Sequence, residues 1–144
     1  MQNPAQIRAL GEIAIRCDNL EAMFAFYRDI VGLKILTQPG ESGIAFFEIG
    51  PSYGGHTAVL ALFRKDAGRS DLHPSSDQAP HTGARSSLHH LALTVDAADQ
   101  DALKTFLDAQ GIPHKTQTFD WIGWRGVFIT DPEGNTVEFV AGGL

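Results

Sequence analysis

The sequence predicts an α+β fold in which two βαβββ modules form a curved mixed sheet with the helices outside. Two observations carry this prediction. The order of one strand, one helix and three further strands occurs twice along the 144 residues. Between the two copies, residues 64–87 contain almost no large apolar side chain, which is typical of a mobile linker. We therefore expect one domain, 1–144, made of module 8–63 and module 88–141.

The first module opens with a strand over residues 11–17, because apolar and polar side chains alternate there. The helix that follows has a capping-box pattern, with Asp18 as the expected N-cap and Glu21 three residues later. Gly32 is the expected end of this helix. Three strands complete the module, over residues 33–36, 44–49 and 57–63.

The second module repeats this order from a strand over residues 89–95. Asp96 is the expected cap of its helix, and Gly111 is the expected end. The last two strands are joined by Asp-Pro-Glu-Gly-Asn at 131–135, a turn in which proline sets φ and glycine tolerates a left-handed backbone. The predicted strands are 115–119, 126–130 and 136–140.

The charge and composition exclude several classes of function. Eleven basic against 17 acidic residues leave a net charge of −6, so there is no basic field to attract nucleic acid. We find no basic leader and no run of about 18 apolar residues, so we expect a cytoplasmic protein without a membrane partner. The single cysteine, Cys17, excludes an internal disulfide framework and is expected to be a buried thiol.

Three ionisable side chains are expected on the face of the sheet away from the helices. Glu12 and His90 occupy the same position in the first strand of each module, and Glu138 alternates with the apolar residues of the last strand. Two carboxylates and an imidazole on rigid strands suit a divalent metal. The alternatives are that Glu12 pairs with Arg16, that His90 is a satisfied core histidine or assists the neighbouring His89, and that Glu138 is a surface residue.

Three segments of the sequence resemble the vicinal oxygen chelate superfamily. They are the two module openings, GEIAIRCDNLEAMFAFYRDIVGLKIL and HHLALTVDAADQDALKTFLDAQGI, and the ending WRGVFITDPEGNTVEFV. That superfamily contains glyoxalase I, bleomycin-resistance proteins, fosfomycin-resistance enzymes, methylmalonyl-CoA epimerase and extradiol dioxygenases. The resemblance implies a glyoxalase-like fold over nearly the whole chain outside the linker.

The resemblance also implies a metal site, with one divalent ion (Zn, Ni, Co, Mn or Fe) per site. Its ligand positions fall on Glu12, His90 and Glu138. A fourth ligand of the family, from the last strand of the first module, falls on Leu60 or, next to it, Ala61, and both are apolar. The fourth ligand position is then filled by water, by the substrate or by His56, or it stays without a ligand.

The function that this resemblance favours is a lyase or isomerase acting on a small substrate with adjacent oxygens. The metal would stabilise an enolate while Glu138 or Glu12 acts as the base. The alternative is a metal-free protein that binds a small molecule, as in bleomycin resistance. An extradiol dioxygenase is favoured less, because it requires two histidines and a carboxylate, and only His90 lies at such a position.

Substrate contacts and assembly are expected as follows. Two tryptophans in the loop before a strand are expected at the rim of the cleft, with two arginines acting locally: Trp121, Trp124, Arg16 and Arg125. Other aromatic side chains, among them Phe119, are further candidates to line an apolar ligand site. Each module leaves a sheet edge that it cannot cover alone, so modules must pair within or between chains. We expect a homodimer, because two-fold symmetry covers both edges at once.

Overall fold

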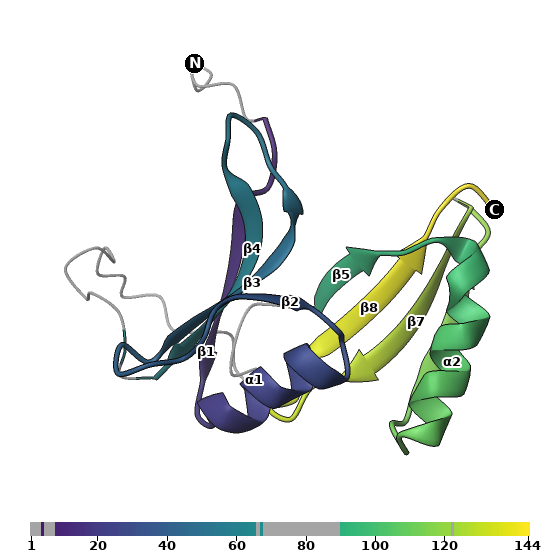
Figure 1. The fold of residues 1–144 in the computed structure, drawn as a ribbon. Helices are drawn as coiled ribbons and strands as arrows, with labels where there is room; N and C mark the ends of the chain where they lie inside the picture. Colours follow the sequence, from purple (N-terminus) through teal and green to yellow (C-terminus); the bar gives the residue numbers. More distant parts are fainter. Residues whose placement is uncertain (1–3, 5–7, 66, 68–89, 122) are drawn as a thin grey trace, which may run out of the picture. The chain divides into compact units, whose positions relative to one another are not determined.

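The computed structural model describes residue 4 and residues 8–65, 67, 90–121 and 123–144. The chain divides into two compact units, 1–73 and 74–144, which we call module 1 and module 2 (Figure 1). The predicted linker, 64–87, lies almost entirely outside the described residues. Among the described residues, no helix is long and apolar enough to span a membrane.

Module 1 contains five elements in the predicted order. They are β1 (Glu12–Cys17), α1 (Leu20–Asp29), β2 (Lys34–Thr37), β3 (Ile44–Pro51) and β4 (Thr57–Arg64). The four strands form a sheet in the order β1-β4-β3-β2, in which β1 runs parallel to β4 and the other neighbours are antiparallel. The predicted βαβββ topology is therefore confirmed for this module.

Module 2 repeats the topology with one short addition before its helix. Its elements are β5 (His90–Thr94), η2 (Ala97–Asp99), α2 (Gln100–Ala109), β6 (Lys115–Phe119), β7 (Trp124–Thr130) and β8 (Thr136–Ala141). The sheet order is β5-β8-β7-β6, with the parallel pair again formed by the first and last strands. The described strands thus form one four-stranded mixed sheet in each module.

Helix α1 packs on one face of the module 1 sheet because its apolar side chains recur at helical spacing. The ring of Phe24 stacks on Phe47 at 5.1 Å between centroids, and Tyr27 lies 6.5 Å from the same ring. Met23, Tyr27 and Phe47 are all 0% exposed. Cys17 is also 0% exposed on this face, as the sequence predicted.

The helix ends match the predictions, but the helix starts do not. Gly32 and Gly111 have φ of +81° and +68°, which lets the chain turn away after each helix. The N-cap of α1 is Asn19, whose side chain accepts a hydrogen bond from the Ala22 amide, so the choice of Asp18 was wrong by one residue. Asp96 precedes the 3-10 turn η2, and its side chain makes no capping hydrogen bond.

The turn between β7 and β8 is held by one buried carboxylate. Asp131, which is 4% exposed, accepts hydrogen bonds at Oδ1 from the amides of Glu133 and Asn135, both at 2.9 Å. Its Oδ2 accepts from the side-chain amide of Asn135 at 2.8 Å. Gly134 has a φ of +87°, as this turn requires. The turn therefore fixes where β8 begins.

Candidate functional site

The candidate site lies on the face of the module 2 sheet away from the apolar core. Val137 and Phe139 of β8 are buried at 0% and 4% exposure on the core side. Alternation along the strand therefore turns Thr136 and Glu138 to the opposite face. His90 opens the neighbouring strand β5, where it pairs with Thr136 in the parallel register.

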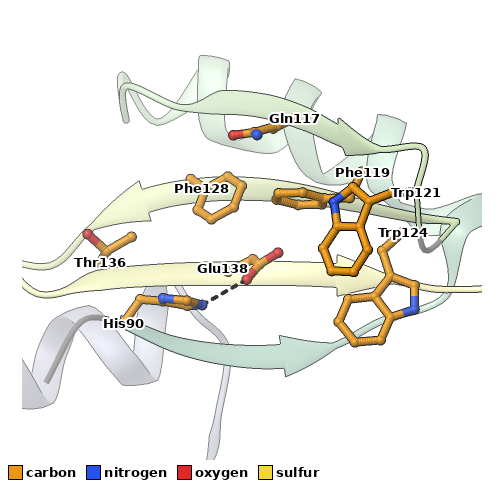
Figure 2. Close-up of a pocket in the computed structure, with 8 residues that line it drawn as sticks. All are labelled: His90, Gln117, Phe119, Trp121, Trp124, Phe128, Thr136 and Glu138. Carbon is orange, nitrogen blue, oxygen red and sulfur yellow. Dashed lines mark ion pairs between the residues drawn. The ribbon is translucent and has the colours of Figure 1, made fainter.

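His90 and Glu138 meet on this face (Figure 2). Nε2 of His90 lies 3.2 Å from Oε2 of Glu138, close enough for an ion pair or a hydrogen bond. The carboxylate is the more enclosed partner, since Glu138 is only 6% exposed. A buried carboxyl group without a polar partner would be strongly unfavourable, and the His90 imidazole is such a partner. Two of the three predicted metal ligands are thus brought together.

A pocket of about 400 Å³ opens over this pair. Its lining comes from all four strands of the module 2 sheet and from the turn before β7: His90, Gln117, Phe119, Trp121, Trp124, Phe128, Thr136 and Glu138 (Figure 2). Four of these side chains are aromatic, and none is lysine or arginine. The pocket therefore combines a wall suited to flat or apolar groups with one polar pair at its base.

The aromatic lining is ordered by contacts among its own members. The Phe128 ring lies edge-on to the His90 imidazole at 6.5 Å and to Phe119 at 6.4 Å. Trp121 and Trp124 are 82% and 45% exposed, so both offer surface to a ligand. The two predicted tryptophans do line the pocket, although ligand contact itself stays a prediction.

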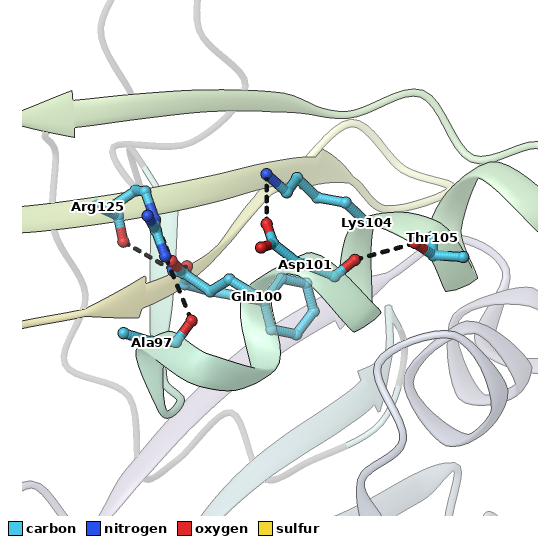
Figure 3. A network of polar contacts seen from close by, with 7 residues as sticks. Ala97, Gln100, Asp101, Lys104, Thr105 and Arg125 are labelled. Carbon is cyan, nitrogen blue, oxygen red and sulfur yellow. Dashed lines mark hydrogen bonds and ion pairs between the residues drawn. The ribbon is translucent and has the colours of Figure 1, made fainter.

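Arg125 lies elsewhere, on the opposite face of the same sheet (Figure 3). Its guanidinium donates from Nε to Oε1 of Gln100 at 2.5 Å and from Nη2 to the Ala97 carbonyl at 3.3 Å. Gln100 is 0% exposed and donates in turn to the carbonyls of Arg125 and Phe139. Arg125 therefore ties the start of α2 to the sheet and does not line the pocket.

Glu12 and Arg16 belong to module 1, where both are exposed on β1. Within the described part of the chain, no ion pair joins the two, so the alternative role of Glu12 finds no support. No group of three or more His, Cys, Asp or Glu side chains that could hold a metal is present among the described residues. The third predicted ligand therefore stays a prediction.

The strand registers show which residue of module 1 corresponds to Glu138. In module 2, Leu91 pairs with Val137 and Ala92 with Glu138, while in module 1 Ile13 pairs with Leu60 and Ala14 with Ala61. Because Ile13 and Leu91 are equivalent in their strands, the counterpart of Glu138 is Ala61. Leu60, the first choice from the sequence, faces the core. His56 is exposed in the turn before β4.

Sequence reasoning did not identify three lining residues, Gln117, Phe128 and Thr136. Thr136 was already on the same side of its strand as Glu138, so alternation alone would have included it. Gln117 and Phe128 depend on the register between β6, β7 and β8, in which Phe128 lies directly opposite Glu138. That register is visible only in the folded sheet.

Comparison with known proteins agrees with this architecture. A family model, the Glyoxalase/Bleomycin resistance protein/Dioxygenase superfamily, matches residues 9–139. The chain therefore belongs to that superfamily, and the glyoxalase-like fold expected from the sequence is confirmed. No curated protein sequence gave a significant match to the chain.

Two solved structures show how far the similarity extends. Lactoylglutathione lyase from Agrobacterium tumefaciens is 29% identical, with 98% of this chain and 96% of that chain covered and a TM-score of 0.64. A glyoxalase/dioxygenase from Nostoc punctiforme is 22% identical, with coverage of 100% and 97% and a TM-score of 0.69. The second comparison supports the fold alone.

Proposed function

We propose that the protein is a metal-dependent lyase or isomerase whose substrate is a small molecule with adjacent oxygens. The observation that carries this proposal is the contact between His90 and the buried carboxylate of Glu138 at the base of an aromatic pocket. The lactoylglutathione lyase structure, 29% identical over 98% of this chain, supports the same reaction class. S-lactoylglutathione is therefore the first compound to assay.

The donors in the pocket fit a divalent metal of the Zn, Ni, Co, Mn or Fe type. Imidazole nitrogen and carboxylate oxygen are ligands that these ions accept, and His90 and Glu138 already lie 3.2 Å apart on neighbouring strands. Glu12, of this chain or of a second copy, is our proposed third ligand. A bound ion would act as a Lewis acid toward two substrate oxygens.

The side chains of the chain itself would supply the remaining chemistry. Glu138 would accept a proton from a carbon beside a substrate carbonyl, and its enclosed position at the base of the pocket supports this role. Glu12 is the alternative base. The aromatic walls would exclude water from the reacting carbon and position the apolar part of the substrate.

Elemental analysis of protein purified without chelator tests the metal site. We expect about one divalent ion per chain in the wild type and at least a tenfold loss of affinity in His90→Ala and Glu138→Gln. His114→Ala is a matched control, because His114 also pairs with a carboxylate, Asp108 at 2.8 Å, away from the pocket lining. A wild-type protein that stays empty in metal-supplemented buffer at neutral pH would overturn the proposal.

The second candidate function is metal-free binding of a small, flat molecule. The aromatic lining favours it, and so does the contact between His90 and Glu138, because these two polar groups already have each other as partners without a bound ion. Quenching of tryptophan fluorescence by planar ligands, measured in the presence and absence of EDTA, separates the two functions. Binding that EDTA leaves unchanged, with no turnover of any compound, would favour the second.

We further propose that the working unit is a homodimer in which Glu12 and the pair of His90 and Glu138 form each site together. Mixing Glu12→Ala with His90→Ala after denaturation and refolding tests this. If sites form between chains, mixed dimers regain metal binding at one of their two sites. A monomeric mass by light scattering, with no recovery on mixing, would show that each chain builds its own site.

A further inference from the structure

Gly126 occupies a position in β7 where the backbone does not require glycine. The φ angle of Gly126 is not positive, so its backbone conformation is open to any residue. The residue pairs regularly with Gln117 of β6 on one side and with Val140 of β8 on the other. Glycine in the middle of a strand is unfavourable, since it contributes no packing and loses more backbone freedom on folding than other residues. Another reason must account for glycine at this position.

The space beside Gly126 is already taken by the side chains of the pocket. Alternation along β7 turns position 126 to the same face as Trp124 and Phe128, which both line the pocket. A Cβ atom at this position would collide with Oε1 of Glu138 and would lie 2.8 Å from Cε2 of Phe128. The carboxylate therefore lies in the space that a side chain at 126 would fill.

Module 1 shows the reverse arrangement at the equivalent positions. Gly126 pairs with Val140, two residues after Glu138, and Ile44 pairs with Phe63, two residues after Ala61. The counterpart of Gly126 is therefore Ile44, next to the counterpart of Glu138, which is Ala61. Module 1 has the large residue, Ile44, on its third strand and the small residue, Ala61, on its fourth. Module 2 has the small residue, Gly126, on its third strand and the large residue, Glu138, on its fourth.

We propose that Gly126 is a positioning residue of the pocket. Its missing side chain opens the place in which the Glu138 carboxylate lies within reach of His90. A methyl group at 126 would force the carboxylate to leave this place, while the backbone of β7 stays compatible with alanine. The geometric part of this proposal is independent of the function of the pocket, and its consequence for metal binding rests on the proposed function.

A double-mutant cycle on thermal unfolding tests the geometry without any metal. Gly126→Ala should lower the unfolding midpoint by about 5 °C in the wild type, because overpacking is destabilising. In a Glu138→Ala background the same change should lower it by less than half as much. Gly50→Ala is the control, since Gly50 also lies in a strand and an added Cβ there meets nothing within 4 Å. Equal shifts in both backgrounds would overturn the proposal.

Binding of Co²⁺, followed by calorimetry and by the visible absorption of the ion, tests the consequence for the site. Gly126→Ala should weaken binding at least about tenfold and change the absorption spectrum. Adding Glu138→Asp, which draws the carboxylate back by one methylene, should recover part of this loss, although Glu138→Asp alone weakens binding. Unchanged affinity in Gly126→Ala, or losses that simply add in the double variant, would contradict the positioning role.

The two experiments separate failure of the proposed function from failure of this inference. If the wild type does not bind Co²⁺, the metal site is wrong, and the unfolding cycle still decides whether Gly126 makes room for Glu138. If the wild type binds Co²⁺ and the cycle shows no coupling, the metal site stands and the role of Gly126 is wrong.

Discussion

Module 1 and module 2 have the same topology, yet the sheet face away from the helix carries different chemistry in each. At equivalent positions, module 1 has Ala61 beside Ile44, and module 2 has Glu138 beside Gly126. Ala61 is 0% exposed among apolar neighbours, whereas Glu138 lies at the base of a pocket. One exchange of a large and a small residue between adjacent strands therefore accompanies a closed position at Ala61 in module 1 and an open, polar position at Glu138 in module 2.

The helix sides of the two modules also differ at one matched position. Helix α1 begins with Leu20, and helix α2 begins with Gln100. Gln100 is fully buried and accepts a hydrogen bond from Arg125 (Figure 3). It also donates to the carbonyl of Phe139, the residue after Glu138. Module 2 thus has a polar clamp, formed by Gln100 and Arg125, on the helix side of β8, the strand that carries the candidate base.

The largest effect is expected from giving module 1 the carboxylate of module 2. Ala61→Glu should lower the free energy of unfolding by more than about 3 kcal/mol, because it forces a carboxylate into a fully buried position and overpacks the sheet against Ile44. Urea denaturation followed by circular dichroism measures the change.

Two further variants separate the causes of this effect. Ala61→Leu adds bulk without charge and should be less destabilising than Ala61→Glu. Adding Ile44→Gly to Ala61→Glu should restore part of the lost stability, because it reproduces the small neighbour of Glu138. If Ala61→Glu is as stable as the wild type, the Ala61 position of module 1 tolerates a carboxylate as well as the Glu138 position of module 2 does, and the proposed difference between the two faces is wrong.

The next effect comes from replacing the clamp of module 2 with the apolar residue found in module 1. Gln100→Leu should lower the free energy of unfolding by about 2 kcal/mol, since the carbonyls of Arg125 and Phe139 and the Arg125 guanidinium each lose a partner. Gln110→Leu, at the exposed end of the same helix, serves as the control. A Gln100→Leu variant that matches the control would show that the clamp does not stabilise the module.

A smaller effect is expected in the turns that precede the last strand of each module. Asp131→Ala should lower the free energy of unfolding by about 1.5 kcal/mol, because it removes the acceptors of three hydrogen bonds. In module 1, the Ser52 hydroxyl donates a long hydrogen bond, 3.3 Å, to the Leu10 carbonyl, so Ser52→Ala should change stability by less than about 0.5 kcal/mol. Similar losses for both variants in urea unfolding would contradict this difference.

The smallest effect concerns pH and the exposed charges on α2. A hydrogen bond and the positive charge of Lys104, 3.0 Å away, hold the pKa of the Asp101 carboxylate below its ordinary value of 3.8. A lowered pKa means that this pair stabilises the fold above about pH 4 and that the contribution is lost as the pH falls below it. Asp101→Asn should therefore melt slightly below the wild type at pH 7, and this difference should shrink as the pH is lowered to 3.

Salt provides the control for this last prediction. Both side chains reach solvent, so added salt at pH 7 should remove the difference in melting temperature between Asp101→Asn and the wild type. A difference that persists at high salt and at pH 3 would show that the substitution acts through the helix itself.

Much of the fold was predictable because local patterns are strong in this sequence. The alternation in β1 and β5, the helical spacing that buries Tyr27, and the glycines that end both helices are all local signals. The N-caps were less predictable, since Asp18 and Asn19 are adjacent and both are good capping residues. Strand ends differed from the predictions by one or two residues, because a strand extends as far as the neighbouring strand offers backbone hydrogen-bond partners.

Part of the candidate site was also predictable. His90 and Glu138 were expected on one face from alternation alone, and the structure brings them to 3.2 Å. Arg125 was expected near the substrate, but it alternates with Trp124 and so turns to the helix, where Gln100 binds it. The sequence did not show this contact, because residues 100 and 125 meet only after α2 packs on the sheet.

The sequence by itself determined the two βαβββ modules, the turn at Asp131 and the residue types available for chemistry, because periodicity and turn chemistry act over a few neighbouring residues. Only the tertiary structure decided that Ala61 is the counterpart of Glu138, and that Gly126 makes room for the carboxylate. Those relations depend on the register between strands that are far apart in the chain. A shift of one residue would exchange the two faces of a strand, and that choice is made by packing of the whole sheet.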